Sequence, residues 1–451
     1  MLRGGVEPSG QERAHAGSLR VLVSAFACCP STSSRFSGGE DILGWHLVKQ
    51  IARFHETYVL THAPDRADIE QSLAHTPELH LHFEYVALPR WLRPLQRVQG
   101  GIQLYCYLWQ IRAYFVARKL LARYQFDLIH HLTYANDWMA SFLGALLPVP
   151  YIRGPGGGAH RVPAGLLNEY PLAGRIAEQV RTAMQWLFRH DPFFVWGQRR
   201  ARKILVCNRE ARNALAWGWR TKAVLFPVNG VSSEDLTCLN GSSPTGGTQG
   251  FHVLSAGKLM RLKGFPLALK AFKRFSEHHP DAQLEIIGDG PDRHHLLWLI
   301  DSLGLKERVR LTLWKPREEF LSLLSQCDVF LFPSLRDGGG AVVVEAMGAG
   351  KPVVCLDLGG PGWHVTDTCG IKVAAHDPKQ VVADLAEALE TLHQDDGLRF
   401  RMGQAARERA RSVYHWDRLG ERLRDIYQDV LAPQRSETET EQDSVLRVGV
   451  H

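Results

Sequence analysis

The sequence of 451 residues predicts an α/β protein made of two parallel-sheet, Rossmann-like domains that face a central cleft. Short apolar, strand-like runs alternate with longer amphipathic stretches from residue 18 to about residue 430. The alternation breaks once, at residues 232–250, where Ser, Gly and Thr accumulate as in a linker. Glycines and charged residues follow several strand-like runs, which is where open parallel sheets bind ligands.

The first domain is expected at residues 18–231. A helix is expected over residues 40–54 because its apolar residues recur at helical spacing. The strand candidates of this half lie at residues 19–24, 57–61, 126–131, 150–153, 203–207 and 222–226.

The second domain is expected at residues 251–414, and it is followed by a helix-like stretch near the end of the chain. Residues 1–17 and 433–451 are polar and are expected to be disordered. The strand candidates of this half lie at residues 251–255, 283–287, 309–312, 329–332 and 352–356.

The excess of positive over negative side chains lies in the first half of the chain. Residues 1–230 carry 27 Lys and Arg against 16 Asp and Glu, whereas residues 231–451 carry 26 against 31. A basic half favours an anionic partner such as a membrane surface or a phosphate-bearing acceptor. A solvated, Arg-rich surface is the alternative. Residues 85–125 mix aromatic and basic side chains, which predicts either contact with an anionic membrane or a helix packed on the first sheet.

Several classes of protein are disfavoured by composition. The eight cysteines are scattered without a CxxC pair, so we expect small core residues in a reducing compartment. The uncharged stretch at residues 138–152 is too short to span a bilayer, which needs about 20 apolar residues. No signal-peptide pattern is visible. The chain is therefore expected to be cytoplasmic, either free or peripheral on the inner face of the membrane, with no nucleic-acid partner.

The most informative segment is residues 333–352, PSLRDGGGAVVVEAMGAGKP. A helix is expected to begin around Gly340, with Asp337 in the loop before it and Glu345 about one turn inside it. Glycines let backbone N–H groups approach a ligand, and a helix N-terminus favours phosphate. Carboxylates at both ends of such a loop suit sugar or ribose hydroxyls. The alternative is a solvated turn acid followed by a helix acid.

This segment resembles the donor-binding motif of glycosyltransferase family 4, retaining enzymes with the GT-B fold. The family motif has two glutamates separated by seven residues, the first near the donor sugar and the second on the nucleotide ribose. Asp337 and Glu345 match these positions, with the first acid one methylene shorter. The resemblance also implies donor contacts from the loop and helix start, at Gly338, Gly339, Gly340, Ala341 and Val342.

A second motif, residues 255–264 (SAGKLMRLKG), follows the first strand of the second half. Lys258 stands where the family usually has arginine, and Lys263 matches the family lysine. The resemblance implies that both cations hold the donor diphosphate, beside Gly257, and form the catalytic set together with Asp337. Two surface lysines on a loop are the alternative.

Further donor contacts are implied at three other strand ends. Gly288 lies in the loop IGDGP, beside the expected nucleotide. Trp314 falls where the family contacts the base, although a half-buried packing aromatic is the alternative. Gly38 and Gly39 precede the first helix, where the family places glycines facing the donor phosphate, and a flexible helix cap would look the same.

Three residues of the first half are candidate contacts of the acceptor or the donor sugar. Of the adjacent histidines His130 and His131, at most one can face the cleft, since neighbouring strand residues point to opposite sides; His131 is the candidate, with a buried core histidine as the alternative. Arg153 stands near the position where many family members have a sugar-contacting histidine. His160, after a glycine run, is a candidate substitute.

The resemblance covers residues 18–432 and implies that residues 415–432 cross back onto the first domain. It implies a retaining transfer of a hexose from a UDP- or GDP-sugar to an acceptor hydroxyl in polysaccharide, glycolipid or glycoconjugate biosynthesis. The acceptor is unidentified, and a lipid-linked acceptor is one candidate.

No cofactor is expected. No metal is expected either, because the histidine pairs at residues 278–279 and 294–295 have no convergent ligands at suitable spacing. A non-catalytic sugar-nucleotide-binding homologue and a sugar-nucleotide epimerase are alternatives. A nicotinamide-dependent oxidoreductase is disfavoured, because the first strand leads to AFACCP instead of GxGxxG.

Overall fold

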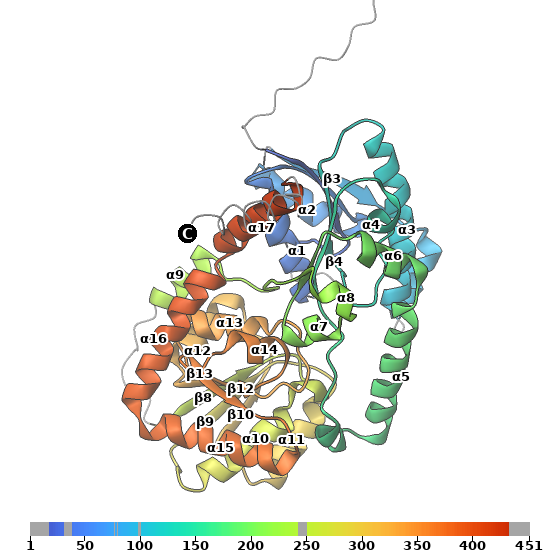
Figure 1. Cartoon of the computed structure of the whole chain (residues 1–451). Helices are drawn as coiled ribbons and strands as arrows, with labels where there is room; N and C mark the ends of the chain where they lie inside the picture. Colours follow the sequence, from blue (N-terminus) through green and yellow to red (C-terminus); the bar gives the residue numbers. More distant parts are fainter. Residues whose placement is uncertain are drawn as a thin grey trace, which may run out of the picture.

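The computed structural model describes residues 18–30, 38–75, 77–78, 80–97, 101–241 and 250–432. Two parallel sheets form the centres of two α/β domains, and helices cover their faces (Figure 1). One sheet has seven strands in the order β3-β2-β1-β4-β5-β6-β7, and the other has six in the order β10-β9-β8-β11-β12-β13. The predicted fold class is therefore confirmed. Both predicted disordered termini lie outside the described residues.

The N-terminal sheet contains all six predicted strands and one more, β3, at its edge. Exposed and buried residues alternate along β3, so the sequence lacks the continuous apolar run of a central strand. The strands are β1 (Arg20–Ala25), β2 (Glu56–His62), β3 (Leu81–Val86), β4 (Leu128–Thr133), β5 (Tyr151–Gly156), β6 (Lys203–Val206) and β7 (Ala223–Leu225).

The helices around this sheet include the predicted first helix and a long helix, α3, that follows β3. They are α1 (Gly38–Ala52), α2 (Arg66–His75), α3 (Gly101–Leu121), α4 (Phe142–Leu146), α5 (Leu172–Arg189), α6 (Pro192–Arg200), α7 (Arg209–Ala214) and α8 (Trp217–Arg220), with 3-10 turns η1 (Ala63–Asp65), η2 (Arg90–Arg97) and η3 (Ala164–Glu169).

The C-terminal sheet contains the five predicted strands and the edge strand β13, which was not predicted. Its strands are β8 (His252–Ala256), β9 (Gln283–Ile287), β10 (Val309–Thr312), β11 (Val329–Phe332), β12 (Val353–Leu356) and β13 (Gly370–Val373). Its helices are α10 (Phe265–Ser276), α11 (Arg293–Ser302), α12 (Arg317–Gln326), α13 (Ala341–Gly348), α14 (Gly359–His364), α15 (Pro378–Gln394) and α16 (Asp396–Val413), with the 3-10 turn η4 (Arg261–Lys263).

The segment predicted as a linker begins with a helix, α9 (Ser233–Gly241). Glu234 and Asp235 lie in its first turn, where acidic side chains interact favourably with the helix dipole. Leu236 and Leu239 are buried in the core of the C-terminal domain. The linker prediction therefore missed nine residues of packed helix, and residues 242–249 lie outside the described residues.

Helix α17 (Trp416–Leu431) returns to the N-terminal domain and packs against α1 (Figure 1). Asp417 accepts a hydrogen bond from Gln50 Nε2 at 3.1 Å. The Tyr427 hydroxyl lies 2.6 Å from His130 Nδ1 on β4. The last described helix therefore packs onto the N-terminal domain.

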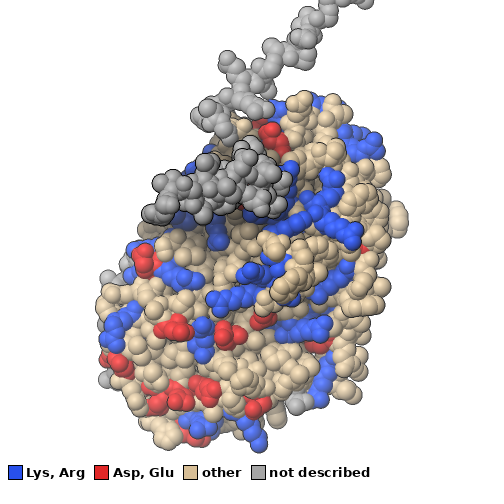
Figure 2. Space-filling model, viewed as in Figure 1, with Lys and Arg blue, Asp and Glu red and all other residues tan. Residues whose placement is uncertain are grey.

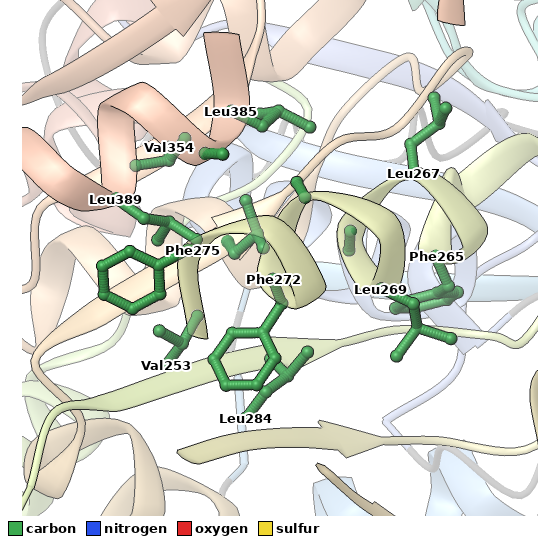
Figure 3. Close-up of a cluster of buried hydrophobic side chains, with 14 of the residues drawn as sticks. Val253, Phe265, Leu267, Leu269, Phe272, Phe275, Leu284, Val354, Leu385 and Leu389 are labelled. Carbon is green, nitrogen blue, oxygen red and sulfur yellow. The ribbon is translucent and has the colours of Figure 1, made fainter. Parts of the chain in front are cut away.

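Apolar clusters hold α10 and α15 against one face of the C-terminal sheet. Phe272 and Phe275 on α10 pack with Leu385 and Leu389 on α15, as Figure 3 shows. Fully burying each such side chain contributes about 1.5–3 kcal/mol. Three residues from the N-terminal half join the same cluster, namely Val162, Leu166 and Tyr170. The segment before α5 is therefore anchored in the C-terminal domain.

Helix α3 belongs to the basic, aromatic segment for which membrane contact or packing was predicted. One face of α3 is buried, and Trp109 Nε1 donates to the Val86 carbonyl at 3.0 Å. Helix α3 is therefore packed against the N-terminal domain, as the second alternative expected.

Seven of the eight free cysteines are buried, as expected of core residues. No helix among the described residues has the length and apolar character needed to cross a bilayer.

Candidate functional site

The glycine loop (residues 337–340) connects β11 to α13 and is organised by Asp337. Its Oδ1 atom accepts hydrogen bonds from the N–H groups of Gly339 at 3.1 Å and Gly340 at 2.9 Å. Gly340 has φ +66°, a left-handed conformation that favours glycine, and it is the N-cap of α13. A free helix N-terminus therefore opens directly beside a carboxylate.

Lys263 forms an ion pair with Asp337, and both side chains are largely buried, at 19% and 14% exposed. Burial would raise the pKa of Asp337, but Lys263 and the N–H groups of the loop outweigh it and hold that pKa below its ordinary value. Asp337 is therefore ionised at neutral pH. The structure brings together two of the three predicted catalytic residues.

Lys258, the third predicted catalytic residue, is exposed after β8 and forms no ion pair within the described part of the chain. The two glycines predicted beside the donor, Gly257 and Gly288, adjoin each other. Gly257 N donates to the Ile287 carbonyl at 3.0 Å, and a Cβ on Gly288 would lie 2.0 Å from the Gly257 carbonyl oxygen. Only glycine lets these two loops approach so closely.

Glu345 lies on α13 and receives a hydrogen bond from Arg317 Nη1 at 2.7 Å. Arg317 Nε also donates to Asp235 at 3.0 Å. Despite burial, these carboxylates raise the pKa of Arg317. Sequence reasoning missed Arg317, because it lies 28 residues before Glu345 and belongs to no recognisable motif. Trp314 is half exposed at the end of β10, so its base contact stays a prediction.

His160 reaches the glycine loop from the N-terminal domain. A Cβ on Gly338 would lie 3.2 Å from His160 Cε1. The ring is buried, and its Nδ1 atom has no hydrogen-bond partner within the described residues. Burial lowers the pKa of His160 to about 4, although the charge of Asp337 opposes this, so the ring is neutral at physiological pH.

Two further residues of the N-terminal domain contact this region and were not predicted. Asn208 Nδ2 donates to the Gly338 carbonyl at 3.1 Å, and Glu210 Oε1 accepts from Gly359 N at 2.7 Å. Both lie after β6, at the carboxyl end of the N-terminal sheet. Strand-end placement was the one signal that could have identified them.

His131 and Arg153 are both enclosed in the N-terminal domain, and their contacts with the acceptor or the donor sugar stay predictions. His131 is fully buried with Nε2 3.2 Å from Gln110 Nε2. Arg153 donates to the Met139 carbonyl at 3.2 Å, and its guanidinium lies 4.8 Å from the centre of the Phe194 ring. Every residue of β4 and β5 is buried. A residue that aligns with a ligand-contacting position of the family can therefore point into the core of the domain instead of toward a ligand.

Gly38 and Gly39 open helix α1, and a Cβ on Gly39 would meet no atom within 4 Å. The next residue, Glu40, accepts a hydrogen bond from Tyr134 N at 2.6 Å. Burial raises the pKa of Glu40 to about 7, although this hydrogen bond acts in the opposite direction. The N-terminal glycine motif therefore carries a carboxyl group that titrates near neutrality.

The expectation that the paired histidines have no convergent ligands needs correction for His279. It lies near Glu390 and His393 of α15, with one ligand atom of each within 4.8 Å of the others. The packing of α10 on α15 joins residues that are 111 positions apart. His279 lies before β9, on the side of the sheet where the strands begin, whereas the glycine loop follows the end of β11. This cluster therefore lies away from the candidate donor site.

Residues 247–409 match the family model described as Glycosyl transferases group 1. This match covers 163 of the 451 residues, and all of them but residues 247–250 lie in the expected C-terminal domain. The D-inositol 3-phosphate glycosyltransferase of Corynebacterium kroppenstedtii is 35% identical over 183 residues, which are 39% of this chain and 40% of that protein. The chain thus matches less than half the length of this relative. All four motifs at the ends of β8, β9, β10 and β11 lie within the matched domain.

Solved glycosyltransferase structures share the whole fold. A glycosyltransferase from Rickettsia africae aligns with a TM-score of 0.64 and 12% identity, over 93% of this chain and all of that one. Anabaena Alr3699/HepE in complex with UDP-glucose aligns with a TM-score of 0.59 and 17% identity, over 91% of this chain and all of that one. At these identities the likeness establishes the GT-B fold alone.

Proposed function

We propose that this protein is a glycosyltransferase that moves a hexose from a nucleotide-diphosphate sugar to an acceptor hydroxyl. The observation that carries the proposal is the Lys263–Asp337 ion pair at the N-terminus of α13, inside a glycosyl transferases group 1 domain. A cation and a free helix N-terminus suit a diphosphate, and an adjacent ionised carboxylate suits sugar hydroxyls.

In this proposal Lys258, Lys263 and the N–H groups at the start of α13 hold the diphosphate. They stabilise the negative charge that develops as the bond from the anomeric carbon to the diphosphate oxygen breaks. Asp337 orients the sugar, while Glu345, held by Arg317, accepts from the ribose hydroxyls. The acceptor oxygen forms the new bond on the face from which the diphosphate leaves, and its proton passes to the departing phosphate oxygen. Retention of anomeric configuration follows from attack on that face.

UDP-sugars are the first donors to test, because the Anabaena structure contains UDP-glucose, and GDP-sugars are the second. The transfer is proposed to need no metal, and loss of turnover on treatment with EDTA would count against this. The acceptor is proposed to be a lipid-linked or polysaccharide precursor at the inner face of the membrane. The support is charge, since residues 101–231 carry 17 Lys and Arg against 6 Asp and Glu.

The test is a panel of UDP-, GDP- and ADP-sugars, read by the shift in melting temperature and by release of the free nucleotide diphosphate. Asp337→Ala and Lys263→Ala are the test variants. Lys306→Ala is the control, since Lys306 pairs with Asp301 on the exposed surface. We expect one donor to stabilise the protein and to be slowly hydrolysed by the parent and the control, but not by the test variants.

Other outcomes favour other functions. Stabilisation without hydrolysis or transfer to any membrane extract would favour a non-catalytic sugar-nucleotide-binding protein. Conversion of the donor into an epimeric sugar, seen by product analysis, would favour an epimerase. A folded protein stabilised by none of the donors would contradict the proposal.

A further inference from the structure

Helix α5 exposes apolar side chains along its whole length. Six of the seventeen large hydrophobic residues that are exposed among the described residues lie on this one helix, each between 45% and 72% exposed. Five of them are spaced three or four residues apart, which places them along one side of the helix, and the sixth, Trp186, flanks this row. They are Leu172, Ile176, Val180, Met184, Trp186 and Leu187. We call this surface the α5 stripe.

The charged residues of α5 face the protein instead. Arg181 donates to the carbonyls of Gly158 and His160, both at 3.1 Å. Glu178 accepts from Arg336 at 2.7 Å. The exposed positions of α5 outside the α5 stripe hold only uncharged side chains, namely Ala173, Ala177, Gln179 and Ala183. A helix on the surface of a soluble protein normally has the reverse arrangement, so the α5 stripe calls for a partner that covers it.

We propose that the α5 stripe docks onto the surface of an anionic lipid bilayer. Charge complementarity supports a bilayer as the occupant. The basic excess of the N-terminal half lies entirely in residues 101–231, which include α5, because residues 1–100 carry ten Lys and Arg and ten Asp and Glu. Figure 2 shows extensive blue Lys and Arg surface and little red Asp and Glu surface over the upper right part of the face that it draws.

Helix α6, which contacts α5, also exposes an aromatic side chain and basic side chains. Trp196 is half exposed on α6, and Arg199 and Arg200 are exposed at its end. Tryptophan suits the boundary between headgroups and acyl chains, and each basic residue near an anionic surface contributes about 1 kcal/mol. A second copy of this chain is a poorer occupant, since a two-fold interface would bring the two basic surfaces together.

The inner face of α5 connects the α5 stripe to the candidate donor site. Arg181 holds the backbone of His160, whose ring lies against Gly338. Glu178 holds Arg336, the residue before Asp337. A bilayer on the α5 stripe would therefore lie beside the glycine loop, where a lipid-linked acceptor could enter. This consequence rests on the proposed function, whereas the docking itself does not.

The test is co-sedimentation of the full chain with vesicles of phosphatidylcholine alone or mixed with equal phosphatidylglycerol. The test variant is Ile176→Glu/Val180→Glu/Leu187→Glu. The control is Leu297→Glu/Trp298→Glu, which makes the same kind of change at two exposed residues of α11. We expect binding to the anionic vesicles only, weakened about tenfold or more in the test variant, because each residue loses the burial of an apolar side chain. The control variant should bind as the parent does.

The proposal is overturned if the parent fails to bind anionic vesicles or if the test variant binds as well as the parent. It is also overturned if sedimentation velocity shows a dimer that the test variant dissociates, since a second copy would then cover the α5 stripe. The donor-induced melting shift of the test variant serves as a separate measurement. If that shift persists while vesicle binding is lost, the donor site is intact, so failure of docking and failure of the transferase proposal remain distinguishable.

Discussion

The ammonium of Lys263 and the carboxylate of Asp337 join two loops that are 74 residues apart in the sequence. Each loop follows a neighbouring strand of the C-terminal sheet, since β8 and β11 are adjacent. Lys263 also lies 5.2 Å from the ring of Phe332, at the end of β11. The pair therefore brings one positive and one negative charge together at the candidate donor site.

Removing Lys263 should affect both stability and activity. Lys263→Ala leaves the buried Asp337 carboxylate without its cation, which we expect to cost about 2 kcal/mol or more. Lys263→Arg keeps the charge and should cost less. Urea unfolding measures the stability, and release of nucleotide diphosphate measures the activity, which should be lost in Lys263→Ala. A double-mutant cycle with Asp337→Asn tests the coupling, and purely additive effects would contradict the pairing.

Gly264 should tolerate substitution much less well than Gly304. Both have left-handed φ values, +71° and +67°, but a Cβ on Gly264 would lie 1.9 Å from the Pro333 carbonyl oxygen, whereas Gly304 has nothing within 4 Å. We expect Gly304→Ala to cost about 1–2 kcal/mol from backbone conformation alone. Gly264→Ala should cost clearly more and reduce donor binding as well. Equal unfolding midpoints for the two variants would show that the two loops can separate without penalty.

His160 should contribute to turnover without acting as a titrating group. Its pKa of about 4 keeps the ring neutral above pH 5.5, so the pH dependence of kcat/KM should contain no step due to this residue. We expect His160→Ala to lower turnover about 10- to 100-fold, because the glycine loop loses a packing contact. His160→Gln should lose less. A step near pH 6.5 in the parent that disappears in His160→Gln would contradict this prediction.

The strands and the candidate donor loops could be predicted because each carries a local signal. A central parallel strand has a continuous run of apolar residues in the sequence. The glycine loop has three glycines and an acidic residue directly before a helix. Edge strands β3 and β13 lack such runs. The resemblance located Arg153 and His131 but could not give the direction of their side chains, which depends on packing within the sheet.

The remaining features depend on contacts between distant parts of the chain. Arg317 meets Glu345 only after α12 packs beside α13. The charged side chains Glu178 and Arg181 of α5 face the protein because their partners lie there. Arg336 comes from the other domain, and the carbonyls of Gly158 and His160 come from the loop before the helix. The sequence of α5 shows an amphipathic helix, but it does not show which face is covered.

Because of Glu40, stability should fall as pH rises from about 4.5 to about 7. In the unfolded chain this carboxyl titrates near 4.5, whereas burial raises its pKa to about 7 in the folded protein. The folded state therefore binds the proton more tightly, so the contribution of Glu40 is fully present below pH 4.5, declines between pH 4.5 and 7, and is lost above pH 7.

Glu40→Gln removes this titration and keeps an oxygen that can accept from Tyr134 N. We expect the variant to exceed the parent in free energy of unfolding at pH 8 by about 1–3 kcal/mol, and by less at pH 5.5. Urea unfolding at the two pH values measures the difference. Glu70→Gln, which changes an exposed acid paired with Arg66 on α2, is the matched control and should show a much smaller pH-dependent gain. If the Glu40→Gln and parent curves stay parallel from pH 5.5 to 8, Glu40 is already ionised throughout that range, and the glycine motif at the start of α1 carries a fixed negative charge instead of a titrating one.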